Sequence, residues 1–146
     1  MSYRIQEALA FALHQADMQI KTEFTRRLKP YEITSEQFAV LATLWRKDGM
    51  SQRELGDLLV KDRPNVTRML DKMAGKGLLE RRADPDDRRV QQVFVTAKGR
   101  ELEDELVPVA LAFRAEAYRG ISPAEQTMIY SLLNRILRNL NADPTA

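Results

Sequence analysis

The sequence has no cysteine, a single histidine and no long apolar run. Without cysteine, the chain cannot form disulfides, thiolate metal sites or thiol-based redox sensors. No apolar stretch approaches the ~18 residues that a membrane-spanning helix needs. The first residues also lack the apolar segment of a signal peptide. We therefore expect a cytoplasmic protein.

Residues that form catalytic sites are equally scarce. His14 has no second histidine and no serine–aspartate pair at a useful spacing, and no glycine-rich phosphate loop is present. Asp84, Asp86 and Asp87 lie close together, but this segment lacks the glycine and the distal glutamate of a calcium loop. We expect no enzymatic activity, no metal and no cofactor.

The charge of the chain is unevenly distributed. The formal net charge is only +2, yet residues 51–100 hold 12 Lys and Arg against 8 Asp and Glu. The rest of this 146-residue chain, a length that suits one domain with its own core, is slightly acidic. Concentrated positive charge is typical of a nucleic-acid contact, although a solvated charged surface is an alternative explanation.

Two short helices are predicted within this basic segment. The first begins with a capping box formed by Ser51 and Glu54. The second begins after Asp62, a good N-cap, tolerates Pro64 in its first turn and ends at Gly77 in the left-handed conformation. Two short helices with a tight connection predict a helix-turn-helix. The second helix has an apolar face at helical spacing, formed by Val66, Met69, Leu70 and Met73.

Polar side chains remain on the outer side of these helices. They are donors suited to phosphates and base edges, and they concentrate in the half of the second helix that a recognition helix inserts into the major groove. The residues expected to face the major groove are Arg63, Asn65, Thr67 and Arg68. The residues expected to contact phosphates are Ser51, Gln52, Arg53 and Lys72.

A charged β-hairpin is predicted after the second helix. Residues 78–82 and 90–96 have the composition of two short strands. The connecting residues 84–89 combine turn-forming side chains with paired arginines. A charged hairpin next to a helix-turn-helix is a wing.

Four motifs in this order carry a family resemblance. They are Asp-Arg-Pro-Asn-Val-Thr-Arg (62–68), Lys-Gly-Leu-Leu-Glu-Arg (76–81), Asp-Pro-Asp-Asp-Arg-Arg (84–89) and Val-Thr-Ala-Lys-Gly (95–99). In this combination the chain resembles the MarR family of winged-helix regulators over nearly its whole length. The resemblance implies that Arg89 enters the minor groove and that Asp87 orients it. Arg88 is expected to act from the same wing tip.

Helices are predicted on both sides of the winged module. The periodicity of apolar residues predicts a helix over Tyr3–Lys29 and another that begins after Thr34 as its N-cap. A helix capped by Thr96 contains Pro108, which should kink it. The last helix begins after Ser122, with proline at its first position.

The predicted fold is mainly α: a winged helix-turn-helix with long N- and C-terminal dimerisation helices and a two-stranded β wing. The terminal helices carry apolar area that could cover the module in a monomer. A dimer explains it better, because helix-turn-helix proteins read two half-sites ~34 Å apart. We assign residues 1–146 to one MarR-like domain, with dimerisation helices at 1–30 and 121–146, the winged helix-turn-helix at 34–99 and a connecting helix at 97–119.

The resemblance also implies a cleft for a small, often aromatic anion between the dimer helices and the winged module. Aromatic residues at helical spacing are more often plain core, and His14 is more often a hydrogen-bonded structural histidine than a ligand contact. An effector would act by favouring one spacing of the two wings, with the helix at Pro108 as a hinge. The candidate pocket residues are Phe11, His14, Met18, Phe38, Trp45 and Phe113.

These observations predict a DNA-binding transcriptional regulator. We expect a homodimeric repressor that binds a pseudo-palindromic operator in double-stranded DNA and is released by a small aromatic or anionic effector. Two alternatives stay open. One is an effector-independent architectural DNA-binding protein, and the other is a winged helix that serves only protein–protein contact.

Overall fold

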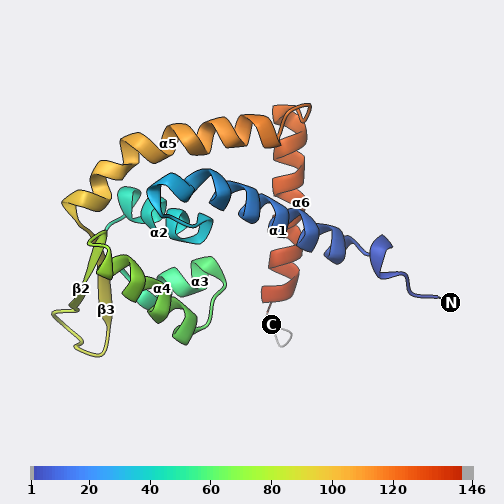
Figure 1. Cartoon of the computed structure of the whole chain (residues 1–146). Helices are drawn as coiled ribbons and strands as arrows, with labels where there is room; N and C mark the ends of the chain where they lie inside the picture. The colour runs from blue at the N-terminus through green and yellow to red at the C-terminus, as the bar shows by residue number, and fades with distance from the viewer. Residues whose placement is uncertain (1, 143–146) are drawn as a thin grey trace. The chain divides into compact units, whose positions relative to one another are not determined.

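The computed structural model describes residues 2–142, which fall into two compact units with a boundary between Phe113 and Arg114. The chain is mainly helical with a small sheet, which confirms the predicted fold class (Figure 1). Its elements are, in order, η1 (Ile5–Glu7), α1 (Leu9–Leu28), η2 (Lys29–Tyr31), α2 (Ser35–Arg46), β1 (Met50–Ser51), α3 (Gln52–Leu59), α4 (Arg63–Gly75), β2 (Leu79–Ala83), β3 (Gln91–Val95), α5 (Ala97–Ala117) and α6 (Pro123–Asn141).

The sheet has three antiparallel strands in the order β1-β3-β2. The hairpin of β2 and β3 is the predicted wing, and its register pairs Leu79 with Val95 and Ala83 with Gln91. Strand β1 was not predicted, because a strand of two residues shows no alternation. It pairs Met50 with Val93, so the chain just before α3 is tied to the wing.

One hydrophobic core holds the first unit together, and it contains the predicted inner face of α4. Val66, Leu70 and Met73 are buried, and Met69 packs against the core. Each fully buried leucine or methionine adds about 1.5–3 kcal/mol to stability. This burial fixes which side of α4 faces outward. The buried core comprises Leu28, Ile33, Val40, Leu41, Leu44, Leu55, Val66, Leu70, Met73, Leu78, Leu79, Val93, Val95 and Leu106.

The helix ends follow from local capping. Thr34 and Gln37 form a reciprocal capping box, with both N···O distances at 3.1 Å. The Asp62 carboxylate accepts from the Asn65 N–H at 2.9 Å, as a helix N-cap should. Gly77 follows α4 with φ +74°, which confirms the predicted left-handed stop.

Two helix starts differ from the sequence-based expectation. Only half of the box at Ser51 is seen: its hydroxyl accepts from the Glu54 N–H at 3.0 Å, and Ser51 also belongs to β1. The predicted helix start at Tyr3 was wrong. Ala8 is extended, and α1 begins at Leu9, because the preceding residues provide no capping side chain and form only the short turn η1.

Helix α5 begins as predicted and continues through its proline. The Thr96 hydroxyl accepts from the Gly99 N–H at 3.1 Å. The helix is unbroken on both sides of Pro108, so the proline does not divide it into two helices. The Trp45 indole donates to the Gly99 carbonyl at 3.0 Å, and a Cβ atom at Gly99 would lie 2.2 Å from the Leu78 carbonyl oxygen. Only glycine therefore fits where α5 leaves the wing.

The second unit contains the last turn of α5 and helix α6. Ser122 and Glu125 form the predicted capping box, with N···O distances of 2.9 and 3.1 Å. Among the residues described in α6, no side chain is buried. Several large apolar side chains are exposed, namely Met128, Ile129, Tyr130, Leu132, Leu137 and Leu140. Residues 143–146 of the predicted C-terminal segment, and Met1, lie outside the described residues.

No helix within residues 2–142 is both long and apolar enough to cross a membrane.

Candidate nucleic-acid interface

The outer face of α4 carries most of the predicted base-reading residues. Because the opposite face is buried, Arg63, Asn65, Arg68 and Lys72 are exposed. Thr67 is half-buried, and its hydroxyl donates to the Arg63 carbonyl at 3.0 Å. This internal bond uses the hydroxyl proton, so the oxygen of Thr67 is left as an acceptor.

Three side chains at the start of α4 form a chain of hydrogen bonds, which we call the Asp62–Asn65–Arg68 relay. The Asn65 amide nitrogen donates to the Asp62 carboxylate at 3.0 Å. The Arg68 guanidinium donates to the Asn65 amide oxygen at 2.8 Å. Asp62 is itself held by its cap on the helix backbone. The relay therefore fixes the amide of Asn65 and places Arg68 on the exposed face of the helix.

The tip of the wing is built around two aspartates. The Asp84 carboxylate accepts from the backbone N–H of Asp86 at 2.8 Å and of Asp87 at 3.2 Å, which folds the turn. The Asp87 carboxylate in turn accepts from Arg89 Nε at 3.0 Å and Nη2 at 3.1 Å. These bonds, the Arg89 side chain first and its backbone N–H second, lower the pKa of Asp87. The Arg89 side chain stays 91% exposed, and Arg88 is exposed beside it.

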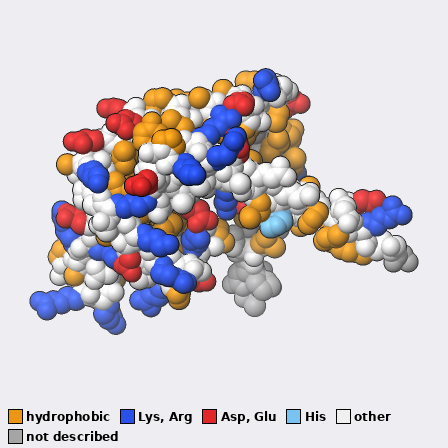
Figure 2. Space-filling view, in the orientation of Figure 1, with side chains coloured by type: hydrophobic (Ala, Val, Ile, Leu, Met, Phe, Trp, Pro, Cys, Tyr) orange, Lys and Arg blue, Asp and Glu red, His pale blue; other side chains and the backbone are white. Residues whose placement is uncertain are grey.

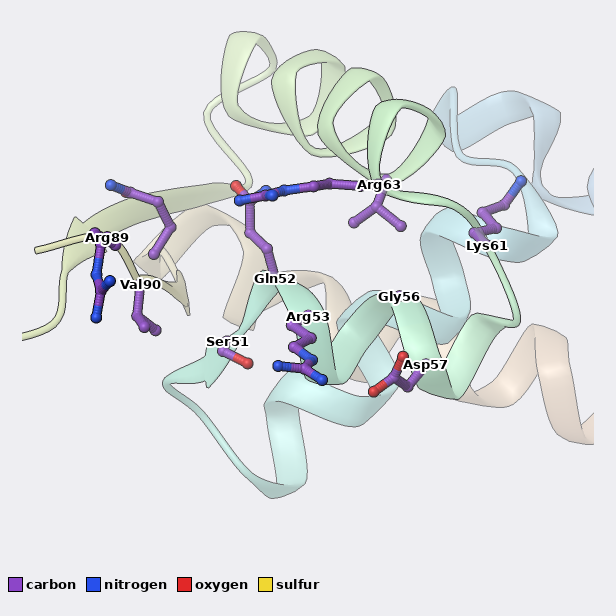
Figure 3. Close-up of a pocket in the computed structure, with 11 residues that line it drawn as sticks. Ser51, Gln52, Arg53, Gly56, Asp57, Lys61, Arg63, Arg89 and Val90 are labelled. Atoms are coloured by element: carbon purple, nitrogen blue, oxygen red, sulfur yellow. The ribbon is translucent and has the colours of Figure 1, made fainter. Parts of the chain in front are cut away.

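A hollow of about 430 Å³ lies between α3, the start of α4 and the wing (Figure 3). We call it the cationic hollow, because four basic side chains and a single acidic one line it. Positive charge gathered in a concave site attracts phosphate. The lining residues are Ser51, Gln52, Arg53, Gly56, Asp57, Lys61, Arg63, Val66, Arg89, Val90 and Gln91.

The structure thus brings five predicted residues together at the hollow: Ser51, Gln52, Arg53, Arg63 and Arg89. The other predicted α4 residues lie outside its lining and farther along the helix. In the space-filling view, basic side chains also protrude at the lower left, over the wing (Figure 2). The predicted DNA-contacting residues therefore come from three neighbouring elements.

Two functional candidates were missed from the sequence. Lys61 lines the cationic hollow, and its Nζ lies 2.8 Å from a carboxylate oxygen of Glu36 on α2. Its place just before the N-cap Asp62 was a usable signal, because residues at a helix N-terminus face bound anions. Arg81 on β2 bonds to Gln52 and Asp71, which lie 29 and 10 residues away. No local sequence pattern predicts contacts between residues this far apart in the chain.

The six predicted effector residues occupy two different environments. Phe38, Trp45 and Phe113 pack with Phe24 as an aromatic cluster. Ring centroids in this cluster lie 5.1 Å apart for Phe24–Phe38, 5.2 Å for Phe24–Phe113 and 5.9 Å for Phe38–Trp45. The Arg27 guanidinium lies 5.3 Å from the centroid of the Phe113 ring. These three residues therefore contribute to the packing of the first unit.

The other three candidates lie nearer the start of α1. Phe11 and His14 stack with ring centroids 6.3 Å apart, and both His14 and Met18 are exposed. His14 thus does not have the burial of a structural histidine within this chain. Among the described residues, no three His, Cys, Asp or Glu side chains gather as metal ligands.

Comparisons with known proteins agree with this geometry. The model of the MarR family matches residues 33–90, which contain the helix-turn-helix and most of the wing. The uncharacterized HTH-type transcriptional regulator YkoM of Bacillus subtilis (strain 168) is 33% identical over 110 residues. That match covers 75% of this chain and 71% of YkoM.

Two solved structures are similar along nearly the whole chain. BpsR of Bordetella bronchiseptica, whose DNA binding is regulated by 6-hydroxynicotinic acid, has a TM-score of 0.84 and 27% identity, covering 98% of this chain and all of that one. The transcriptional repressor CouR, bound to a 23-mer DNA duplex, has a TM-score of 0.81 and 28% identity, covering 94% of this chain and all of that one. The chain therefore belongs to the MarR family of DNA-binding transcriptional regulators, which are not enzymes.

Proposed function

We propose that this regulator is a repressor that binds a pseudo-palindromic operator as a homodimer. The observation that carries the proposal is the basic surface shared by α3, α4 and the wing, with the cationic hollow between them. CouR is a repressor bound to a DNA duplex, and its structure resembles this chain over 94% of its length. A repressor acts by occupying its operator, which requires sequence-specific contacts from this surface.

The proposed contacts follow from the placement of each side chain. The exposed face of α4 enters the major groove, where arginine and asparagine pair with guanine and adenine. Ser51, Gln52 and Arg53, which line the hollow, contact backbone phosphates, and so does Lys72 farther along α4. The wing tip reaches the minor groove through Arg89, which Asp87 orients, with Arg88 beside it. The base-reading set is Arg63, Asn65, Thr67 and Arg68, and the phosphate-contacting set is Ser51, Gln52, Arg53 and Lys72.

The homodimer is proposed from uncovered apolar surface in each unit. Helix α6 begins with a strong capping box yet buries none of its described side chains. At the other end of the chain, Tyr3, Ile5 and Leu9 are also exposed. Helices with exposed apolar faces associate to remove those faces from water. Residues 1–30 and 121–146 are therefore the proposed dimerisation segments of a single domain.

Release by a small aromatic or anionic effector is the second part of the proposal. BpsR provides the precedent, since 6-hydroxynicotinic acid regulates its DNA binding. In this chain the candidate residues for the effector pocket are Phe11, His14, Met18, Phe38, Trp45 and Phe113. An effector must bind one spacing of the two wings more tightly than another in order to change operator affinity.

Selection of bound genomic fragments, followed by footprinting, tests the proposal. We expect a palindrome with half-sites centred about one helical turn apart and a dimer in sedimentation analysis. Binding without sequence preference would favour an architectural protein. Weak binding with no footprint would favour a protein-interaction module. A thermal-shift screen with hydroxylated aromatic acids tests the effector, and a rise in Tm together with weaker operator binding is expected.

A further inference from the structure

Arg81 occupies an unusual place for a charged residue. Side chains alternate along β2, so Arg81 lies on the same face as the buried Leu79 and opposite the fully buried Val93. Its own side chain is 24% exposed. A guanidinium directed toward a core face needs compensating partners. The partners of the Arg81 guanidinium therefore determine where this side chain lies.

The Arg81 guanidinium joins three elements of the DNA-binding surface. Nη1 donates to the Gln52 side-chain oxygen on α3 at 3.2 Å, and Nη2 donates to the Asp71 carboxylate on α4. Arg81 itself is part of the wing. The forked geometry of one side chain thus fixes the wing strand against both helices of the helix-turn-helix.

The same contact determines how Gln52 presents its amide. Arginine has donors only, so the oxygen of the Gln52 amide must face it. The amide nitrogen, with its two N–H donors, is then the end left for other partners. Gln52 lines the cationic hollow, where a phosphate oxygen would accept from such donors.

We propose that Arg81 is a positioning residue for DNA binding. It holds the wing against α4 and orients the Gln52 amide donors for a backbone phosphate in the cationic hollow. This inference rests on the proposed DNA contacts of the hollow and the wing. It adds a residue that acts through others, without a DNA contact of its own.

Substitution of Asp71, the carboxylate partner of Arg81, distinguishes positioning from a simple effect of charge. If charge alone mattered, Asp71→Asn would strengthen DNA binding, because it removes a negative charge from a surface that attracts phosphate. If Arg81 positions the surface, Asp71→Asn weakens binding by about fivefold and Arg81→Gln by about tenfold, and the double variant is no weaker than Arg81→Gln. The matched controls are Glu80→Gln and Arg82→Gln. Glu80 and Arg82 form an ion pair on the other face of β2. Each control should change DNA affinity only as much as the change of one charge requires.

Salt dependence separates positioning from direct contact. When a lysine or arginine loses a phosphate contact, the slope of log K against log salt falls in magnitude by about 0.9, whereas loss of a contact from the neutral Gln52 leaves the slope unchanged. For Arg81→Gln we therefore expect the wild-type slope together with a lower affinity. A reduced slope, or Asp71→Asn binding as tightly as wild type, would overturn the inference. If the wild-type protein selects no operator, the proposed function fails instead.

Folding is checked in parallel by thermal unfolding of each variant. Arg81→Lys keeps the charge but loses the fork, so its affinity should fall between wild type and Arg81→Gln. If Arg81→Gln does not fold, Asp71→Asn and Arg81→Lys still test the inference. Charge alone predicts tighter DNA binding for Asp71→Asn and unchanged binding for Arg81→Lys, whereas positioning predicts weaker binding for both. Wild-type affinity in both would also overturn the inference.

Discussion

Asp87 and Arg89 form a bidentate ion pair at the wing tip, with Asp87 Oδ1 3.0 Å from Arg89 Nε and Asp87 Oδ2 3.1 Å from Arg89 Nη2. The pair leaves the arginine almost fully exposed while restricting where its guanidinium points. Exposed ion pairs add little to stability, usually less than about 1 kcal/mol. We therefore interpret this pair as orienting the arginine toward a partner.

Arg89→Ala should weaken operator binding substantially. Loss of a base-reading pair costs about 1–3 kcal/mol, which corresponds to roughly a fivefold to 150-fold lower affinity. Arg138→Ala on α6 removes the same charge from an exposed position outside this surface and should cost much less. A gel-shift titration of both variants decides the point, and equal affinities would contradict the wing assignment.

The pKa of Asp87 provides a second readout of the same pair. Hydrogen bonds from Arg89 lower it, so the pair is intact above the usual pKa of an aspartate, ~3.9, and is lost only as the pH falls through the lowered value. The pair should therefore contribute no pH dependence to DNA binding between pH 6 and 8. In a carboxyl-carbon NMR titration, Arg89→Ala should raise the Asp87 pKa toward its ordinary value. An unmoved titration midpoint would argue against the pair in solution.

Val60→Gly should stabilise the helix-turn-helix. Val60 lies between α3 and α4 with φ +54°, a left-handed conformation that a β-branched residue adopts at a cost, and its side chain is 90% exposed. Removing this strain should raise the free energy of unfolding by about 1 kcal/mol, measured by urea denaturation. Val60→Ile keeps the branched Cβ and should gain nothing. A lower urea midpoint for Val60→Gly would refute this explanation.

Two glycine substitutions should act in opposite directions. Gly99→Ala places a Cβ against the Leu78 carbonyl and should destabilise the protein by about 3 kcal/mol or more. Gly75→Ala, at the end of α4, meets no atom within 4 Å and should stabilise by about 0.5–1 kcal/mol. Thermal unfolding of both variants measures the two signs. A tolerated Gly99→Ala would mean that the start of α5 can move away from the wing.

Local signals predicted the parts of the fold that local chemistry determines. The spacing of Val66, Leu70 and Met73 identified the inner face of α4, and Gly77 identified its end, because each depends on neighbours within a turn or two. Strand β1 and the contacts of Arg81 were missed for the opposite reason. Their partners, Val93 for Met50 and Gln52 for Arg81, come from distant parts of the chain.

The hydrogen bonds from Asp62 through Asn65 to Arg68 hold the Asn65 amide in place before any DNA is present, so its rotational freedom is lost during folding. One N–H of the amide nitrogen and one acceptor position of the amide oxygen remain for a further partner. If α4 enters the major groove as proposed, adenine would use both of them, through N7 and N6. A base that offers only one of these partners would face an amide that cannot turn to suit it, so the entropy already lost in folding would become discrimination between bases.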